Sequence, residues 1–347
     1  MNANQLRCDI FCTVVDNYGD AGVCWRLARQ LAREHGWRVR LWIDDLSRLQ
    51  KLAPDHAAGP VEVRAWQTPW RSAEPADIVI EAFACEPPAA YVSAMAQRIS
   101  PPVWINLEYL SAEAWVAGCH GLPSPHPRLP LVKHFFFPGF GAGSGGLLRE
   151  ADYDRRRAAF DETAFRTEFG LPPRAPGELL VSLFAYPRNR LPELIPALAA
   201  APQPIRLLLP GSEGNLQEQG ALSIHPLPFL PQLRYDELLW ACDLNFVRGE
   251  DSFVRAQWAA KPLVWHIYPQ DDDVHFLKLD AFLERHPAGA LLRPFWHAWN
   301  GRGALVWPTF AALLPALDAP SRQWAQQLRE PPDLASALVH FCLERLK

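Results

Sequence analysis

The stretch Cys242-Asp-Leu-Asn-Phe-Val-Arg-Gly-Glu-Asp-Ser-Phe-Val-Arg-Ala-Gln-Trp-Ala-Ala260 combines the signals of a buried strand, a glycine turn and the start of a helix. Residues 243–247 are mostly apolar and Gly249 interrupts them, which predicts a strand followed by a tight turn. The residues that suit the N-cap and first turn of a helix come next, and they are Glu250, Asp251 and Ser252. Free backbone N–H groups and the positive end of the helix dipole favour an anion at such a turn. The sequence therefore predicts a phosphate or diphosphate site between Arg248 and Ser252.

Glu250 and Asp251 place two carboxylates in this turn, which a plain phosphate site does not need. Capping of the helix is one explanation for Asp251. The whole group Arg248-Gly-Glu-Asp-Ser252 is harder to explain as capping alone. Both carboxylates are therefore candidate site residues, and capping by Asp251 stays open as the alternative.

Length and composition predict a globular protein with two domains. The chain has 347 residues, and a single core rarely grows beyond roughly 250–300 residues. It is 49% apolar and 21% charged, as is usual for soluble proteins with sizeable cores. The net charge is -4, and the closest approach to a basic block, Asp154-Arg-Arg-Arg157, is typical of a solvated helix face. A nucleic acid is therefore not expected as the main partner.

The N-terminus lacks a charged leader followed by an apolar segment, and no apolar run approaches about 18 residues. We therefore expect a cytoplasmic protein that does not insert into a membrane. The seven cysteines are scattered without a Cys-x-x-Cys pair, which favours neither a disulfide framework nor a zinc site. They are Cys8, Cys12, Cys24, Cys85, Cys119, Cys242 and Cys342.

The first half of the chain opens with a βαβ pattern, which predicts a parallel sheet whose first loop faces a ligand. The opening consists of a strand at 8–15, a loop at 16–22, a helix at 23–34 and a strand at 39–43. The elements expected after it are strands at 61–66, 78–83, 103–107 and 134–137 and a helix at 89–98. Glu108 and Tyr109 follow one of these strands, so we expect them where the edge of the sheet opens into a crevice.

A second α/β series follows a proline-rich linker at 171–177. Its strands are expected at 179–186, 205–209, 222–227, 243–247 and 262–268, and its helices at 191–201, 235–241 and 273–285, with a mostly helical remainder. The acidic run Asp271-Asp-Asp273 is expected to cap the helix at 273–285. The predicted domains are 1–155 and 175–330, with a helix at 333–347 that is free to pack back on the first domain.

Two Rossmann-like α/β domains that face each other across a central cleft form the GT-B architecture of glycosyltransferases. Two-domain dehydrogenases have the same alternation of strands and helices, so the fold alone does not decide the function. A dinucleotide site needs Gly-x-Gly-x-x-Gly, but the first loop offers only Gly19 and Gly22 and carries Asp16 and Asp20. These carboxylates would repel a pyrophosphate. The anion site therefore belongs to the second domain, and the first loop suits a cation.

Five segments, in register over nearly the whole chain, resemble the elongation factor P arginine rhamnosyltransferase (EarP) family. They are Asp16-Asn-Tyr-Gly-Asp-Ala-Gly-Val-Cys-Trp-Arg-Leu-Ala-Arg29, Trp104-Ile-Asn-Leu-Glu-Tyr-Leu-Ser-Ala-Glu113, Cys119-His-Gly-Leu-Pro-Ser124, Arg248-Gly-Glu-Asp-Ser-Phe-Val-Arg-Ala-Gln-Trp258 and Ile267-Tyr-Pro-Gln270. The resemblance implies an inverting GT-B glycosyltransferase. Such an enzyme would move L-rhamnose from dTDP-β-L-rhamnose to one arginine of translation elongation factor P. We expect no metal or other cofactor, since no suitable loop carries an Asp-x-Asp motif.

The resemblance also implies roles for individual residues. Asp16 and Asp20 match the family's paired aspartates, with Asp20 as the general base, and Glu250 matches its essential second-domain carboxylate. The donor-binding positions are Phe229 and Gln232 for thymine, Tyr186 near the nucleoside, and Arg248, Ser252 and Tyr268 for the diphosphate, with Gly249 and Asp251 beside them. The acceptor-side loop positions are Asn17, Tyr18 and Gly19.

The residue chemistry agrees with these roles. Two carboxylates can hold a guanidinium fork, and one can accept the proton that the attacking nitrogen loses. Arg248, Ser252 and a helix N-terminus can stabilise the leaving diphosphate without a metal. Simpler explanations stay open: Asp20 as a helix cap, Asp16 in an Asx-turn, and Phe229 as a core residue. Glu250 could orient either the sugar or the acceptor arginine.

Two other functions fit the same sequence. A sugar-nucleotide epimerase or hydrolase of the same fold would use Asp20 and Glu250 on the donor without a protein acceptor. A non-catalytic protein that binds elongation factor P would use the cleft only for docking. A nicotinamide dehydrogenase is the least favoured, because the glycine fingerprint is missing.

Overall fold

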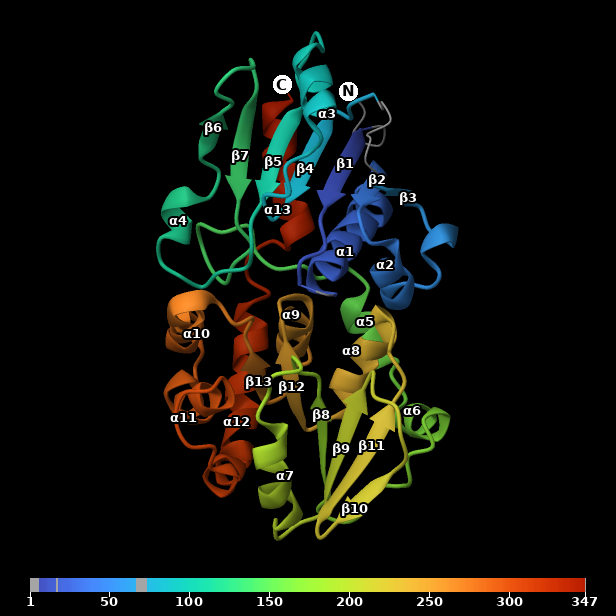
Figure 1. Cartoon of the computed structure of the whole chain (residues 1–347), viewed down its shortest axis with the longest axis vertical. Helices are drawn as coiled ribbons and strands as arrows, with labels where there is room; N and C mark the ends of the chain where they lie inside the picture. The colour runs from blue at the N-terminus through green and yellow to red at the C-terminus, as the bar shows by residue number, and fades with distance from the viewer. Residues whose placement is uncertain (1–5, 17, 67–73, 347) are drawn as a thin grey trace. The chain divides into compact units, whose positions relative to one another are not determined.

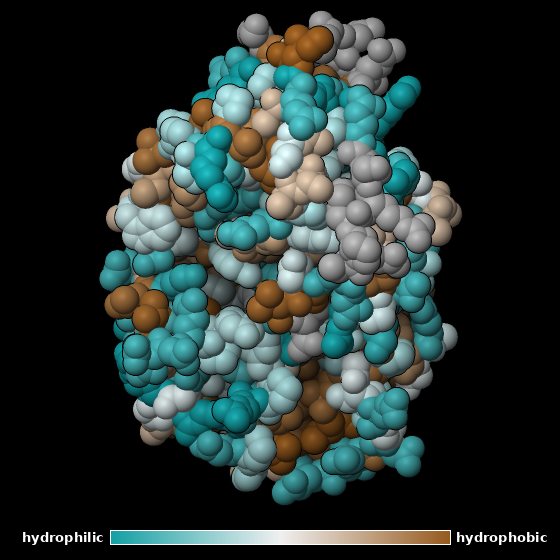
Figure 2. Space-filling model, turned by 45° about the horizontal axis from the view of Figure 1, so that its top comes forward, coloured by the Kyte–Doolittle hydropathy of each residue, from teal (hydrophilic) through white to brown (hydrophobic). Residues whose placement is uncertain are grey.

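The computed structural model of the protein describes residues 6–16, 18–66 and 74–346 (Figure 1). Contacts divide the chain into an N-terminal unit, Met1–Ala151 with Leu328–Lys347, and a C-terminal unit, Asp152–Gln327. Each unit has its own sheet. Along the described stretches, none of the helices has the length and apolar character needed to cross a membrane. Residues of hydrophilic or intermediate hydropathy cover most of the face seen in Figure 2.

The N-terminal unit is built on a sheet with the strand order β3-β2-β1-β4-β5-β7-β6, in which β6 alone among the described strands runs antiparallel to its neighbour. Its strands are β1 (Arg7–Cys12), β2 (Arg38–Ile43), β3 (Glu62–Ala65), β4 (Ile78–Ala82), β5 (Val103–Leu107), β6 (Pro123–Pro125) and β7 (Val132–Phe136). Its helices are α1 (Gly19–Glu34), α2 (Leu46–Leu52), α3 (Ala89–Ala96), α4 (Val116–Cys119) and α13 (Leu334–Arg345).

Helices cover both faces of this sheet, which explains why the central strands are continuous apolar runs. All residues of β4 and β5 are buried. On one face, Tyr91, Val92 and Met95 of α3 pack against Val79 and Trp104. On the other face, Phe341 of α13 lies edge-on to Phe136 of β7, and Figure 1 shows α13 (red) behind the strands.

Helix α1 begins at Gly19, four residues before the start predicted from the sequence. Asp20 therefore lies in the first turn of a helix and not in a loop, and that expectation was wrong. Gly19 and Gly22 are weak helix formers, so propensity alone places the start too late. A carboxylate in the first turn is favoured by the helix dipole, and tertiary packing stabilises the remainder, since Val23, Cys24 and Leu27 are buried.

The last helix of the chain packs within the N-terminal unit. The Leu334 N–H donates to the Leu147 carbonyl at 3.0 Å, and Gln30 Nε2 of α1 donates to Asp333 Oδ1 at 2.8 Å. Asp333 also caps α13, because its side chain accepts from the N–H groups of Ala335 and Ser336. The chain therefore returns to the first sheet after it has built the second.

The C-terminal unit is built on a sheet with the strand order β10-β11-β9-β8-β12-β13, in which β10 is the one antiparallel strand among those described. The strands are β8 (Leu179–Leu183), β9 (Ile205–Pro210), β10 (Gln217–Gln219), β11 (Leu222–Leu227), β12 (Leu244–Arg248) and β13 (Leu263–His266). The helices are α5 (Tyr153–Ala158), α6 (Glu162–Glu168), α7 (Leu191–Ala199), α8 (Gln232–Ala241), α9 (Asp251–Trp258), α10 (Val274–Arg285), α11 (Gly289–Trp299) and α12 (Trp307–Gln327).

The acidic run Asp271–Asp273 does not cap α10 with a side chain, contrary to the expectation from the sequence. The chain forms a short 3-10 turn there, and Asp272 and Asp273 have positive φ angles of 54° and 59°. This backbone directs the Asp273 carboxylate to Arg302 at 3.2 Å. The helix start is thus set by a left-handed turn, which aspartate tolerates better than most residues.

Candidate active site

Asp20 is a buried, hydrogen-bonded carboxylate at the edge of the first sheet. It follows β1 in the chain, and its side chain is 2% exposed. Its Oδ2 atom accepts the N–H groups of Val15 and Asp16, each at 2.8 Å. These donors belong to the loop before α1, and no side-chain cap bond is formed at the start of the helix. The side chain therefore anchors the loop after β1, and the structure does not support the alternative of a simple helix cap.

The surroundings of Asp20 raise the pKa of its carboxyl group above the usual value. Burial is the largest cause. The two backbone hydrogen bonds lower the pKa in part, while the charges of Asp16 and Asp44 raise it. Such a carboxylate holds a proton more readily than an exposed aspartate. A raised pKa is what a general base needs to accept a proton near neutral pH.

Asp16 and Gly19 are in close contact in the same turn. The Gly19 N–H donates to the Asp16 carbonyl at 2.6 Å. A Cβ atom at position 19 would lie 2.7 Å from Asp16 Oδ2, so a larger residue than glycine would push the Asp16 carboxylate out of its observed position. Tyr18 receives a hydrogen bond from Arg48 Nη1 at 3.4 Å, and the Arg48 guanidinium lies 5.2 Å from the centre of its ring. Asn17 lies outside the described residues.

In the C-terminal unit, three neighbouring parallel strands end beside one another and bring Tyr186, Arg248 and Tyr268 together. The rings of Tyr186 and Tyr268 meet edge to face at 5.5 Å. The Arg248 guanidinium lies 4.9 Å from the centre of the Tyr186 ring and 4.2 Å from that of Phe184. A planar cation is thus held on two aromatic rings at the carboxyl end of the sheet, where ligands bind in folds of this type.

The start of α9 holds the predicted Arg248-to-Ser252 turn. Ser252 Oγ accepts the Arg248 N–H at 3.1 Å and also donates to the Arg248 carbonyl. Gly249 has a φ of 58°, and its carbonyl accepts Trp265 Nε1 at 2.8 Å. Glu250 occupies the N-cap position, where no side-chain cap bond is formed. The turn therefore places Arg248 and Ser252 at the N-terminus of α9, and a helix start of this kind suits an anion.

The neighbouring helix α8 begins at Gln232, and this side chain is 3% exposed. Gln232 Nε2 donates to Asp251 Oδ2 at 3.1 Å, so the two helix starts are joined. Phe229 is half-buried and lies over Gly211, whose hypothetical Cβ would be 3.6 Å from the phenyl ring. A ring and a side-chain amide beside an anion site are the groups that can hold a nucleobase.

Comparison with known proteins assigns this arrangement to a family. Residues 8–343 match the family described as Elongation-Factor P (EF-P) rhamnosyltransferase EarP. The chain belongs to the EarP family. It is 48% identical to the protein-arginine rhamnosyltransferase of Pseudomonas putida, with 96% of this chain and 97% of that protein covered.

Solved structures agree with the EarP assignment. One, described as the structural basis for EarP-mediated arginine glycosylation of translation elongation factor EF-P, is 36% identical with a TM-score of 0.69 and covers 98% of this chain and 99% of that one. The glycosyltransferase SnogD from Streptomyces nogalater is 13% identical with a TM-score of 0.51, over 99% and 100% of the two chains. This second likeness concerns the fold alone, and the fold is GT-B.

Within each unit, this EarP chain brings together the residues that the sequence singled out. Asp16, Tyr18, Gly19 and Asp20 share one turn of the N-terminal unit. The members of the C-terminal unit lie at the carboxyl ends of strands or at the starts of helices, and they are Tyr186, Phe229, Gln232, Arg248, Gly249, Glu250, Asp251, Ser252 and Tyr268. Their roles in binding or catalysis stay predictions.

Sequence reasoning missed the residues that support this site. Asp236 of α8 and Arg255 of α9 form a fully buried ion pair with contacts of 2.9 and 2.7 Å. His266 Nδ1 accepts the Tyr186 N–H at 3.2 Å, and burial followed by the charge of Arg248 lowers the His266 pKa to about 4. His266 is therefore neutral at pH 7, which leaves its Nδ1 free to accept. In the sequence, the i, i+4 spacing of Gln232–Asp236 and of Asp251–Arg255 was the one pattern that could have shown that each pair lies on a single helix face.

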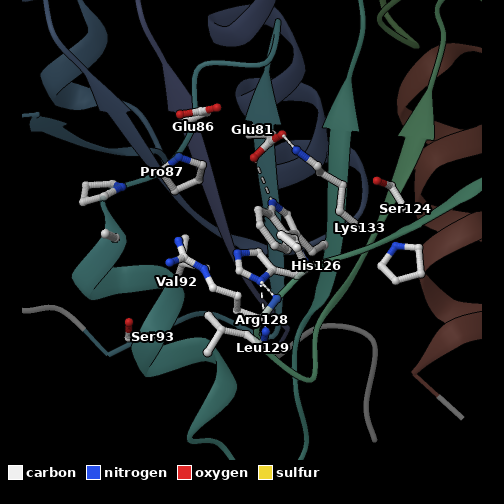
Figure 3. Close-up of a pocket in the computed structure, with 15 residues that line it drawn as sticks. Glu81, Glu86, Pro87, Val92, Ser93, Ser124, His126, Arg128, Leu129 and Lys133 are labelled. Carbon is white, nitrogen blue, oxygen red and sulfur yellow. Dashed lines mark hydrogen bonds and ion pairs between the residues drawn. The ribbon is translucent and has the colours of Figure 1, made fainter.

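A separate hollow of about 870 Å³ lies between α3 and the β6–β7 hairpin (Figure 3). On its floor Lys133 Nζ contacts Glu81 Oε1 at 2.5 Å, and Trp104 Nε1 donates to the other carboxylate oxygen at 3.2 Å. Burial raises the pKa of Glu81, and Lys133 lowers it in part. The opposite charges on the floor neutralise each other. No predicted site residue lines this hollow, so the candidate active site lies elsewhere.

Proposed function

We propose that this EarP chain transfers L-rhamnose from dTDP-β-L-rhamnose to an arginine of translation elongation factor P, with inversion at the anomeric carbon. The family assignment and the protein-arginine rhamnosyltransferases among its relatives support the reaction. The observation that carries the mechanism is Asp20. It is buried, held by two N–H groups, raised in pKa and placed beside a second carboxylate.

In the proposed step, a guanidinium nitrogen of the acceptor attacks the anomeric carbon of rhamnose from the face opposite the diphosphate. The new carbon–nitrogen bond forms as the bond between the anomeric carbon and the phosphate oxygen breaks. dTDP leaves with the electron pair of the broken bond, and Asp20 accepts the proton lost by the nitrogen. Asp16 holds the guanidinium by its N–H groups and keeps the attacking nitrogen oriented.

The donor is assigned to the C-terminal unit because its cationic and N–H donor groups converge there. Arg248, Ser252 and the N-terminus of α9 hold the diphosphate and stabilise the charge that develops on it. Tyr268, which is 45% exposed, is available beside them. These groups supply the charge stabilisation that a metal ion supplies in other transferases, so we propose a metal-independent reaction.

Phe229 and Gln232 are proposed to hold the thymine, the first by stacking and the second by hydrogen bonding. Tyr186 contacts Arg248 of the proposed diphosphate site, which supports its assignment to the nucleoside. Glu250 occupies the N-cap of α9, where its carboxylate orients either the sugar hydroxyls or the acceptor arginine. We propose that the protein acts in the cytoplasm, where translation factors work.

The test is intact-mass and peptide mass spectrometry of elongation factor P after incubation with the protein and dTDP-β-L-rhamnose without added metal. Asp20→Asn and Glu250→Gln are the test variants. Asp55→Asn is the matched control, because Asp55 is an exposed aspartate of the N-terminal unit that forms no side-chain cap bond to the 3-10 helix that follows it. One deoxyhexose on one arginine, lost in both test variants and kept in the control, is the expected result. The loss of a general base lowers the rate by about 10²–10⁴-fold.

Two other results would each identify another function. Release of dTDP without a mass shift, at a rate that elongation factor P does not change, would make the protein a sugar-nucleotide hydrolase or epimerase. Binding of elongation factor P without any donor consumption would leave a non-catalytic binding protein. Stimulation of transfer by a divalent cation, abolished by a chelator, would overturn the metal-independent mechanism alone.

A further inference from the structure

Two loops beside the Asp16–Asp20 turn have no role in the proposed reaction so far. Strands β1, β4 and β5 are neighbours in the sheet and run parallel. The segments that follow them therefore lie along one edge of the N-terminal unit. The loop after β4 contains residues 83–86, and the segment after β5 begins with Glu108 and Tyr109.

The loop after β4 adopts a backbone that costs free energy. Phe83, Ala84 and Glu86 have positive φ angles of 59°, 55° and 47°, although none of them is glycine. Residues with side chains avoid this region, so the surrounding structure must hold them there. Such strain persists where the backbone must hold particular side chains in a fixed position.

Specific contacts hold this loop against its neighbours. The Phe83 N–H donates to the Leu107 carbonyl at 2.7 Å, and the Cys85 thiol donates to the Phe11 carbonyl at 3.2 Å. The buried side chain of Asn106 serves both loops. Its Oδ1 accepts the Ala84 N–H at 3.2 Å, and its Nδ2 donates to Glu108 Oε1 at 2.6 Å. One asparagine thus fixes the two loops relative to each other.

The result of this bracing is a pair of parallel rings. Phe83 and Tyr109 stack with their centroids 4.4 Å apart and their planes at 16°. Both side chains are only half-buried, so they were not drawn together by complete burial in the core. The strained loop therefore presents a flat aromatic surface at the edge of the sheet that also carries Asp16 and Asp20.

The charges along this edge favour a cation on that surface. Glu108 follows β5 directly, and Asp16 and Asp20 lie in the adjacent turn, whereas Glu86 at the far end of the loop after β4 lines the separate hollow. A guanidinium is flat, stays protonated and stacks on aromatic faces, while its alkyl stem packs against the same rings. A lysine ammonium would use the charge but not the flat stacking. The combination of a flat ring pair with carboxylates is thus selective for arginine.

We propose that the side chain of the acceptor arginine lies on the Phe83–Tyr109 stack, which positions its guanidinium for Asp16 and Asp20. The proposal rests on the proposed function for the identity of the acceptor. The stack acts on the acceptor alone, because the donor site is assigned to the C-terminal unit. The ring pair would then determine the choice of arginine over lysine, and Asn106 would position it.

The experiment compares Tyr109→Leu with Tyr109→Phe. Leucine keeps apolar volume but removes the ring, whereas phenylalanine keeps the ring and serves as the matched control. Steady-state kinetics give separate KM values for elongation factor P and for dTDP-β-L-rhamnose. We expect Tyr109→Leu to raise the acceptor KM about three- to thirtyfold with the donor KM unchanged. Tyr109→Phe should stay within about twofold of the wild type for both substrates.

A second measurement tests the contact without any transfer. Calorimetry gives the affinity of the wild type and of Tyr109→Leu for elongation factor P, and for its variant with the acceptor arginine replaced by lysine. If the ring touches that side chain, Tyr109→Leu weakens binding of the arginine form more than binding of the lysine form. If Tyr109→Leu does not fold, Phe83→Leu removes the other ring of the stack, and its affinities for the arginine and lysine forms are compared in the same way.

The outcomes separate this proposal from the proposed function. Transfer by the wild type with equal losses for the two acceptor forms would overturn the stack while leaving the reaction intact. An equal rise in both KM values would assign the rings a structural role and would also overturn it. Selective coupling to arginine binding without any transfer would support the stack and overturn the rhamnosyltransferase reaction.

Discussion

The Nε2 group of Gln232 donates to Oδ2 of Asp251 at 3.1 Å, and this bond joins the starts of helices α8 and α9. One turn further along the same two helices, Asp236 and Arg255 form a buried ion pair. Both steps have i, i+4 spacing, so the two contacts lie on the same faces of the helices. The arrangement ties the residue assigned to the nucleobase to the turn assigned to the diphosphate.

Arg255→Met should destabilise the protein and weaken donor binding. After the change, the fully buried Asp236 carboxylate keeps its ion pair with Arg156 at 3.2 Å but loses the bidentate contact with Arg255. Breaking a buried pair from one side costs about 3–5 kcal/mol. Urea unfolding measures this loss, and calorimetry with dTDP should show a weaker affinity.

Arg322→Met is the matched control for that substitution. Arg322 pairs with Asp318 on the exposed face of α12, with side chains that are 62% and 45% exposed. Exposed pairs contribute at most about 1 kcal/mol. If Arg255→Met costs no more than Arg322→Met, the buried pair does not hold the two helices together.

Asp20→Asn should make the folded protein more stable at neutral pH while it abolishes transfer. Burial raises the pKa of Asp20, so the ionised side chain is less favourable in the folded protein than in the unfolded chain. Asparagine is neutral, and its side-chain oxygen can still accept the Val15 and Asp16 N–H groups. The advantage of the variant should be largest above the folded pKa of Asp20, because there the wild type carries the buried charge.

That advantage should shrink as the pH falls through the folded pKa of Asp20 and disappear below about 3.8, the ordinary value, where the wild type is protonated in both states. Melting temperatures of the two proteins across this range measure the difference. An Asp20→Asn variant that is less stable than the wild type at pH 7 would show that the ionised carboxylate stabilises the loop by more than its burial costs.

Asp16→Asn should move the acid limb of the kcat/KM profile to lower pH in whatever activity remains. The negative charge of Asp16 raises the pKa of Asp20, so its removal makes Asp20 easier to ionise. Asp44→Asn should shift the limb in the same direction by less, because Asp44 has the smaller effect of the two. Asp55→Asn, at an exposed position of the same unit, is the control and should leave the limb in place. A shift to higher pH in Asp16→Asn would mean that another group controls the limb.

Much of the fold follows from the sequence because parallel strands buried on both faces read as continuous apolar runs. The five residues of β5 coincide with the strand predicted at 103–107. Boundaries are less certain where weak helix formers begin a helix, as at Gly19. The predicted linker at 171–177 follows two short helices. The sequence indicated a helix face at 154–157, where α5 lies, but it gave no sign of α6.

The sequence predicts those parts of the candidate site that lie at the ends of strands. Parallel strands end at one edge of a sheet, which favours a site at Arg248, whereas Tyr186 and Tyr268 were added to it by the resemblance to the EarP family. Pairings across the fold leave no local pattern, which is why the contacts of Asn106 with two loops and the stack of Phe83 on Tyr109 became visible only in the structure. Positive φ at non-glycine residues is likewise set by tertiary contacts.

Gly19→Ala should reduce transfer without reducing stability. Alanine favours helix by about 1 kcal/mol over glycine in a helix interior, and position 19 is the first residue of α1. Its Cβ would lie 2.7 Å from Asp16 Oδ2 and must displace that carboxylate. We therefore expect an unchanged or higher melting temperature together with an acceptor KM raised about tenfold, as for a misplaced charge-assisted contact.

Gly118→Ala is the control for this last change, because a Cβ atom at position 118 meets nothing within 4 Å. It lies in the short helix α4 of the same unit and should leave transfer unaffected. Equal activity of Gly19→Ala and Gly118→Ala would mean that the Asp16 carboxylate can move without loss, and that Asp16 does not orient the acceptor. A fall in activity confined to Gly19→Ala, with the donor KM unchanged, would place Asp16 in the acceptor site.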